Sequence, residues 1–199
     1  KLGFKPENIY GFDTDANAVS IAKKRIYAAT GVEPKNIKCA DFLSEASKTP
    51  ALQFDFIFTN PPWGKKIQKE QKEQYGRIFG AGRALDTSAL FFFACIRSLK
   101  EGGHLGLLLP DAFFNIAAFE DARLSISKLE LLRIVDFGKA FKGLMSKAIG
   151  MSLLNRGRTK ESPFVICESA GKRYERNPAS FSKNPKTIFN FWCSPEEND

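Results

Sequence analysis

The feature that most constrains this chain is a short apolar segment ended by two consecutive prolines. Phe54 to Thr59 reads FDFIFT, and Asn60-Pro61-Pro62-Trp63-Gly64 follows it directly. A segment that is almost wholly apolar is typical of a strand buried on both faces of a parallel sheet. Proline fixes φ and has no backbone N–H, so the pair cannot continue sheet pairing. The segment therefore predicts a doubly buried strand that runs into a rigid loop.

The rest of the chain alternates between extended and helical patterns. Extended patterns span Asn8 to Asp13, Asn36 to Ala40, His104 to Leu109 and Leu131 to Phe137. A first helix is expected to be capped by Asp15 and to end at Gly31. A second is expected over Ser88 to Lys100, capped by Asp86 or Thr87 and stopped by Gly102-Gly103, and a third spans Asn115 to about Lys128. Such alternation predicts an α/β fold with an open, doubly wound, mostly parallel sheet. Two further extended stretches, Ser146 to Asn155 and Pro163 to Glu168, lack a helix-sized spacer and are predicted to pair as an antiparallel hairpin at one edge.

Composition excludes several classes of protein. The 199 residues are 43% hydrophobic and 26% charged, which is ordinary globular usage and not that of a disordered or collagen-like chain. The longest apolar run, Ala89 to Ile96, is far shorter than the roughly 18 residues that a membrane-spanning helix needs. A membrane partner is therefore not expected.

The cysteines and the single histidine do not suggest a metal site. The four cysteines lie too far apart for a zinc knuckle or a redox dithiol, and they indicate reduced, mostly buried thiols of a cytoplasmic protein: Cys39, Cys95, Cys167 and Cys193. His104 is the only histidine and stands beside an apolar run, so a structural role is expected for it.

The positive charge is concentrated in two segments. Thirty Lys and Arg against 22 Asp and Glu give a net charge of +8. The basic residues gather between Lys65 and Arg83 and again between Lys139 and Lys160. Clustered positive charge attracts a phosphate backbone, which makes nucleic acid the first partner to consider. A solvated basic surface without a partner is the alternative.

The loop after the apolar strand carries groups suited to binding a planar amino group. Asn60 supplies a side-chain carbonyl beside the backbone carbonyl of Pro61, so together they can accept both hydrogens of such a group. Trp63 offers a flat face on which an aromatic ring can stack. The alternative is that Pro61-Pro62 only ends the strand and that Trp63 is an anchor at its rim.

FDFIFTNPPWG resembles the catalytic loop of class I S-adenosylmethionine-dependent methyltransferases that modify exocyclic amino groups. It is most similar to the N6-adenine DNA methyltransferases of restriction-modification systems. The resemblance implies a Rossmann-like fold, S-adenosylmethionine as cofactor, and catalytic roles for Asn60, Pro61, Pro62 and Trp63. The implied reaction is direct methyl transfer to an adenine flipped out of double-stranded DNA, with no metal and no general base.

Other positions match the same family. Asp13 would bind the cofactor's ribose hydroxyls, Asp41 would accept from its adenine amino group, and Phe42 would lie against the adenine. Helix capping by Asp13 or Asp41 and a core position for Phe42 are the alternatives. In DFGKAFKGLMSKAIG, Phe141 is the candidate that sandwiches the target base against Trp63, although Phe137 stands nearby.

The resemblance covers about Asn8 to Glu168, but one piece of the family pattern is absent. The family begins with a strand and a Gly-rich turn, which would have to precede Lys1. We therefore expect an internal fragment: a partial catalytic domain (1–168) that lacks the N-terminal strand and is inactive alone, then a linker or the start of a target-recognition domain (169–199). A specificity or nuclease domain or subunit is a further expected partner.

Three other functions fit parts of the pattern. A methyltransferase of the same fold can act on RNA or on a protein glutamine, since the loop indicates the chemistry more firmly than the substrate. A non-catalytic DNA-binding subunit would have no physical need for Asn60. A dinucleotide-binding oxidoreductase is disfavoured because the chain contains no Gly-rich turn of the required kind.

Overall fold

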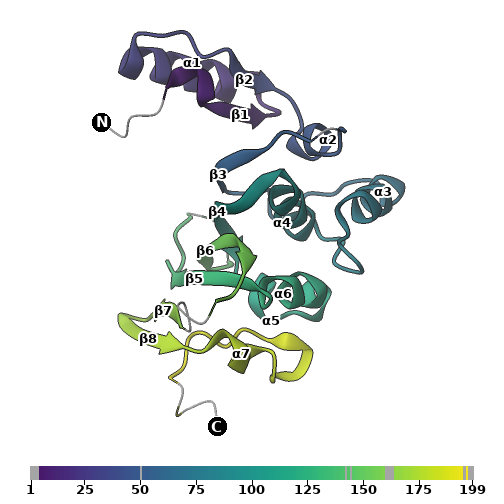
Figure 1. Cartoon of the computed structure of the whole chain (residues 1–199), viewed down its shortest axis with the longest axis vertical. Coiled ribbons are helices and arrows are strands. Elements are labelled where there is room, and N and C mark those ends of the chain that lie inside the picture. The colour runs from purple at the N-terminus through teal and green to yellow at the C-terminus, as the bar shows by residue number, and fades with distance from the viewer. Residues whose placement is uncertain are drawn as a thin grey trace. The chain divides into compact units, whose positions relative to one another are not determined.

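The computed structural model describes residues 5–49, 51–141, 143, 145–159, 164–194 and 196. The chain forms two compact units, Lys1–Pro50 and Ala51–Asp199. Figure 1 shows the first unit as a pair of strands with a long helix and a short one, and the second as a larger sheet with helices packed along it. Among the described residues, no helix is long and apolar enough to cross a bilayer.

The first unit is a β-α-β crossover. Strands β1 (Tyr10–Asp13) and β2 (Asn36–Cys39) pair in parallel and are joined by helix α1 (Ala16–Thr30). As predicted, Asp15 caps α1, accepting a hydrogen bond from the Asn17 N–H at 2.8 Å, and Gly31 ends it in the left-handed conformation. A short 3₁₀ turn precedes β1, and a short helix follows β2: η1 (Pro6–Asn8) and α2 (Phe42–Ala46).

The second unit is built on a six-stranded sheet in the order β3-β4-β6-β5-β7-β8. Its strands are β3 (Phe54–Thr59), β4 (Leu99–Pro110), β5 (Leu129–Asp136), β6 (Ala148–Gly157), β7 (Val165–Ser169) and β8 (Lys172–Arg176). β3 pairs with β4 and β5 with β7 in parallel, whereas β6 is antiparallel to both of its neighbours and β8 is antiparallel to β7. The predicted open α/β sheet is therefore confirmed, but it is mixed rather than mostly parallel.

The predicted edge hairpin has different strands from those expected. β6 does not pair with β7; it lies between β4 and β5, where its alternating buried residues are covered. The hairpin at the edge is formed by β7 and β8, joined at Ala170 and Gly171, which both have positive φ. A two-residue turn of this kind suits the twist of an antiparallel pair. The prediction was wrong because it paired β7 with the extended stretch before it and overlooked the strand that follows it. Pro163, the first residue of the predicted stretch, lies outside the described residues.

The second unit contains helices at both predicted helical segments, with shifted ends, and further helices that the sequence did not predict. They are α3 (Lys69–Phe79), α4 (Thr87–Ser98), α5 (Ala112–Asn115), η2 (Ala117–Phe119), α6 (Glu120–Ile126), α7 (Pro178–Phe181) and η3 (Pro185–Thr187). Asp86, one of the two predicted capping residues, caps α4, and the other, Thr87, is its first residue. The pair Gly102-Gly103 lies inside β4 rather than ending α4. The single helix predicted from Asn115 is broken into η2 and α6.

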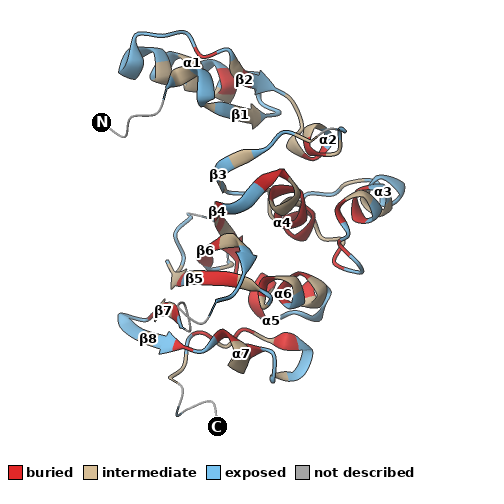
Figure 2. Ribbon diagram, in the orientation of Figure 1, coloured by how far each residue is buried: buried red, intermediate tan, exposed pale blue. Residues whose placement is uncertain are grey.

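The sheet of the second unit has one buried and one exposed face. Along β4, Leu105, Leu107 and Leu109 are buried, while the residues between them are half-buried. On β3, Phe56 is 51% exposed and Phe58 is 71% exposed. The expectation that Phe54–Thr59 is buried on both faces is therefore wrong in this structure (Figure 2). An apolar pattern identifies residues that can be buried, but the tertiary structure decides what covers them.

The C-terminal segment contributes to the core of the second unit. Phe181, Phe189 and Phe191 are buried, and the Phe189 N–H donates to the carbonyl of Phe114 at 2.9 Å. Arg123 is fully buried, and its guanidinium donates to four backbone carbonyls, those of Phe113, Ile116, Lys186 and Thr187. Although this segment is polar in composition, its phenylalanine side chains are buried in the core. The assignment of 169–199 to a linker or recognition domain stays a prediction.

Candidate active site

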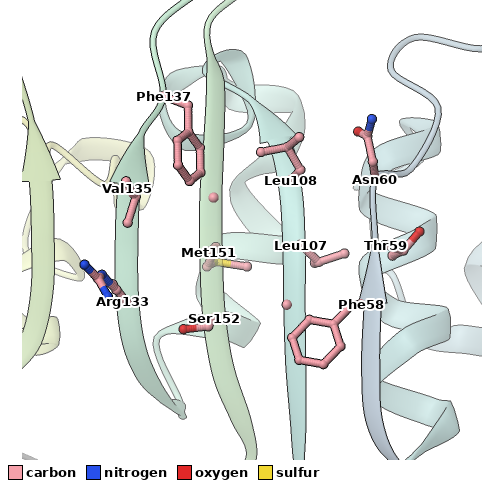
Figure 3. A pocket seen from close by; sticks show the side chains of 12 residues that line it. Phe58, Thr59, Asn60, Leu107, Leu108, Arg133, Val135, Phe137, Met151 and Ser152 are labelled. Carbon is pink, nitrogen blue, oxygen red and sulfur yellow. The ribbon is translucent and has the colours of Figure 1, made fainter. Parts of the chain in front are cut away.

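The predicted catalytic loop leaves the sheet at the carboxyl end of β3. Thr59 is the last paired residue, opposite Leu107, and Asn60 follows it with an exposed side chain. Figure 3 shows Asn60 at the same edge of the sheet as Leu108 and Phe137. Pro61 is buried, whereas Pro62 and Trp63 are half-buried. Among the described residues, neither the Asn60 side chain nor the Pro61 carbonyl has a hydrogen-bond partner, so both oxygens are available as acceptors.

Trp63 is held in place by its indole nitrogen. The Nε1–H donates to the backbone carbonyl of Leu108, on the neighbouring strand β4, at 3.2 Å. The chain then turns at Gly64, whose φ of +64° is one that glycine adopts without strain. Just beyond, the Thr87 hydroxyl donates to the carbonyl of Lys65 at 2.6 Å. The loop is therefore fastened to β4 on one side and to the start of α4 on the other.

Phe141 lies against Trp63. The ring centroids are 5.6 Å apart and the ring planes make an angle of 78°, an edge-to-face contact. The two residues lie 78 positions apart in the sequence, and they meet because β3 and β5 end at the same edge of the sheet. The structure thus brings together the two aromatic residues that the sequence paired as candidates for stacking. Their role towards a base stays a prediction.

A broad groove of about 510 Å³ runs along the exposed face of the sheet below Asn60. On the middle strands the groove is lined by Gly106, Gly150 and Ser152. The ring of Phe58 lies against Gly106 and that of Phe137 against Gly150, where a Cβ atom would come within 2.5 Å and 2.6 Å of the respective ring. Figure 3 shows Phe58, Phe137 and Ser152 among the lining side chains. Sequence reasoning missed this groove. The only signal was the alternation of glycine or serine with leucine and methionine in β4 and β6. Because successive residues of a strand point to opposite faces, this alternation places the small side chains on one face of the sheet.

The candidate cofactor residues all belong to the first unit. Asp13 is the last residue of β1 and Asp41 follows the parallel strand β2, and the Ala40 N–H donates to the carbonyl of Asp13 at 2.9 Å, so both carboxylates are at one edge. Each also has a local role. Asp13 accepts from the Asp15 N–H at 2.8 Å, and Asp41 caps α2 by accepting from the Leu43 N–H at 3.3 Å.

Phe42 is half-buried and contacts Phe12, with ring centroids 5.9 Å apart. The capping and packing alternatives therefore describe real contacts of Asp13, Asp41 and Phe42. They do not exclude ligand binding, because a carboxylate has two acceptor oxygens. The cofactor roles of these residues stay predictions.

Both basic segments contain paired and unpaired residues. In the first, Lys69 pairs with Glu73 and Arg83 with Asp121, whereas the exposed Lys65, Lys66 and Arg77 make no ion pair among the described residues. In the second, Lys147 pairs with Asp136 and Arg156 with Glu130, whereas the exposed Lys139 and Arg158 make no ion pair among the described residues. Lys142 and Lys160 lie outside the described residues. Each segment therefore presents positive charge that is available to a partner.

Cysteine and histidine side chains take structural positions. All four cysteines are free; Cys95 and Cys167 are buried, whereas Cys39 is exposed. Burial raises the pKa of the Cys95 thiol well above its usual range, and burial raises that of Cys167 to about 12. His104 lies beside two phenylalanine rings, with centroids 6.2 Å from Phe56 and 6.0 Å from Phe58. Among the described residues, no cluster of side chains could hold a metal ion.

Known structures share this fold. A chain from a structure of a type I restriction-modification system matches with a TM-score of 0.66 and 17% identity, over 80% of this chain and 32% of that one. A Listeria monocytogenes protein assigned to the class I S-adenosylmethionine-dependent methyltransferases matches with a TM-score of 0.55 and 18% identity, over 80% of this chain and 48% of that one. The fold is that of class I methyltransferases.

Sequence comparison defines the family. The model of the Eco57I restriction-modification methylase family matches residues 7–142, and the chain belongs to this family. It is 45% identical to the Type II methyltransferase M.VspI of Vibrio sp. (strain 343) over 194 residues, which are 98% of this chain and 47% of the relative.

A second relative is more distant. The Type II restriction enzyme and methyltransferase RM.Eco57I of Escherichia coli is 31% identical over 93 residues, 43% of this chain and 9% of the relative. The chain thus spans less than half the length of either relative. The family resemblance predicted from FDFIFTNPPWG is confirmed.

Proposed function

We propose that this chain is part of a restriction-modification DNA methyltransferase that transfers a methyl group to the N6 amino group of adenine. Its membership of the Eco57I family and its likeness to M.VspI support a DNA methyltransferase. The choice of adenine rests on the FDFIFTNPPWG loop itself.

One observation carries the proposal: two carbonyl acceptors stand beside an anchored aromatic ring at the end of β3. The Asn60 side-chain oxygen and the Pro61 carbonyl accept the two hydrogens of an exocyclic amino group. This pulls the nitrogen towards tetrahedral geometry and localises a lone pair that is otherwise delocalised into the ring. Trp63, fixed by its bond to Leu108, supports the plane of the base. Catalysis then depends on orientation and electrostatics.

The first unit supplies groups of the kind that S-adenosylmethionine requires. When bound, this cofactor supplies an electrophilic methyl group on a sulfonium sulfur. Asp13 and Asp41 present carboxylates at the carboxyl edge of two parallel strands, the usual position of ligands in open α/β sheets. Carboxylates accept from ribose hydroxyls and from an adenine amino group, and Phe42 provides an apolar surface. These three side chains therefore fit the groups that the cofactor presents.

The amino group of adenine is paired inside a duplex, so the target base has to leave the helix. Extruding a base costs a few kcal/mol, which stacking between aromatic side chains helps to offset. Trp63 and Phe141 are the candidates for this stacking. The exposed basic side chains after the loop are suited to bind the phosphates that flank the target base; they are Lys65, Lys66 and Arg77.

The substrate is tested by transfer of tritiated methyl from S-adenosylmethionine to unmethylated DNA, RNA and a release-factor protein, using the full-length protein. We expect label in DNA, and after digestion to nucleosides we expect it in N6-methyl-2′-deoxyadenosine. Label in RNA or protein instead would replace the proposed substrate, and no transfer to any of the three would favour a non-catalytic subunit.

Asn60 is the residue whose replacement tests the mechanism. In the full-length protein, Asn60→Ala should lower methyl transfer at least about a hundredfold, because one of the two oriented acceptors is lost. Cofactor affinity measured by calorimetry should stay nearly unchanged. Asn115→Ala is the matched control, since Asn115 is an exposed asparagine outside the loop. Near wild-type turnover in Asn60→Ala would sink the assignment.

A further inference from the structure

The loop that carries Phe141 is closed at its base by backbone hydrogen bonds. It connects β5 to β6. At its neck the Phe137 N–H donates to the carbonyl of Ala148 at 2.9 Å, and the Ala148 N–H donates to the carbonyl of Gly138 at 2.8 Å. Gly138 has a φ of +65°, which turns the chain away from β5. The position of Phe141 therefore depends on how this neck is held.

The carboxylate of Asp136 ties the two ends of the loop together. One of its oxygens accepts from the Gly138 N–H at 2.7 Å, at the start of the loop. The other accepts from Lys147 Nζ at 3.0 Å, at the end of the loop, and from the Ser169 hydroxyl at 3.1 Å on β7. Only 7% of the Asp136 side chain is exposed, so these bonds are largely shielded from water.

The same end of the loop is attached to the strand that holds Trp63. The Asp111 N–H, just after β4, donates to the carbonyl of Lys147 at 3.2 Å. Trp63 itself donates to Leu108, near the end of β4, at 3.2 Å. Both aromatic rings are therefore connected by hydrogen bonds to the end of β4. Trp63 bonds to it directly, whereas Phe141 is connected to it through Lys147 and the neck of its loop.

We propose that Asp136 is a positioning residue for the target base, because it fixes the loop that presents Phe141 to Trp63. This inference rests on the proposed function and adds to it a residue outside the catalytic loop. Asp136 acts through Phe141 and need not touch the substrate. Its charge holds Lys147, and its buried oxygens fix the direction in which the chain leaves β5.

The physical benefit is preorganisation. In this structure the loop holds the Phe141 ring beside Trp63, with 5.6 Å between the ring centroids. A loop that is held near its working position loses less conformational entropy when a base binds. Releasing the neck should therefore weaken capture of the flipped base more than it slows transfer once the base is in place.

The test uses the full-length protein and the variant Asp136→Asn, which keeps the size of the side chain but removes its charge. We expect the KM for target DNA to rise about three- to tenfold, as for the loss of one charge-assisted hydrogen bond, with kcat changed less than about twofold. Fluorescence of 2-aminopurine at the target position should fall in parallel. Lys147→Met, which leaves Asp136 intact, should show the same split.

Asp55→Asn is the matched control. Asp55 also pairs with a lysine, Lys100, at 2.9 Å, but both side chains are more than half exposed and lie at the other end of β3. This control should leave KM and kcat within about twofold of wild type, as expected for a surface ion pair.

The decisive measurement is the double variant Asp136→Asn with Phe141→Ala. If Asp136 acts through Phe141, the first substitution should not raise KM further once the ring is gone. An additive rise, or an unchanged KM in both Asp136→Asn and Lys147→Met, would overturn the positioning role. These outcomes leave Asn60 chemistry untouched, whereas a wild-type protein that methylates no DNA would refute the proposed function itself.

Discussion

The two faces of the six-stranded sheet carry similar apolar side chains but in opposite environments. On one face, Leu105, Leu107 and Leu109 are at most 3% exposed. On the other, Phe58 is 71% exposed and Phe137 is 57% exposed, although phenylalanine is at least as apolar as leucine. The difference shows that apolarity alone does not place a residue in a core. A core also requires a partner layer, and among the described residues of this unit α4, α5 and α6 provide it for one face.

The covered face should account for most of the stability of the second unit. Leu105→Ala should lower its free energy of unfolding by about 2–5 kcal/mol, because a fully buried side chain leaves a cavity. Urea denaturation followed by tryptophan fluorescence measures this, since both tryptophans, Trp63 and Trp192, belong to this unit. A loss below about 1 kcal/mol would mean that the two faces differ less than the structure indicates.

A smaller effect is expected at Asp136, at the edge of the sheet. Burial acts to raise the pKa of this carboxyl, but the Gly138 N–H, the bond and charge of Lys147 and the Ser169 hydroxyl outweigh it, so the net pKa is lowered. A carboxyl whose pKa is lower in the folded than in the unfolded state stabilises the folded state. This contribution is fully present when the pH is above the unfolded pKa of about 3.9, and it is lost as the pH falls through the folded pKa. The stability difference between wild type and Asp136→Asn should therefore be full near pH 7 and vanish in acid. A difference independent of pH would contradict this.

The smallest effect is expected on the exposed face. Phe58→Ala should change the free energy of unfolding by no more than about 0.5 kcal/mol, since most of the ring is already in water. The same urea titration serves as the measurement, with Leu105→Ala as the reference. A loss as large as that of Leu105→Ala would show that this face is covered in solution.

Much of the local structure was predictable from sequence. Asp15 and Gly31 delimit α1 as expected, and Asp86 begins α4. The loop at Asn60 follows β3 directly, because two prolines cannot continue a strand. These features depend on groups close together in the chain, so the sequence pattern contains the relevant physics.

Other features depend on contacts that the chain order does not specify. The insertion of β6 between β4 and β5, and the buried Phe181 and Phe189 in a segment of polar composition, were not predicted. In each case the deciding interaction joins residues far apart in the sequence. Periodicity can show that a segment is apolar on one side, but not which surface it will meet.

The candidate site divides in the same way. The sequence by itself determined which acceptor groups the loop carries, since the carbonyls of Asn60 and Pro61 follow from residue type and proline geometry. Only the tertiary structure decided that Trp63 bonds to Leu108, that Phe141 lies against Trp63, and that Asp136 holds the Phe141 loop. The reason is that a side chain's own hydrogen-bonding groups are written in the sequence, whereas its partners depend on which strand ends the folded sheet brings to one edge.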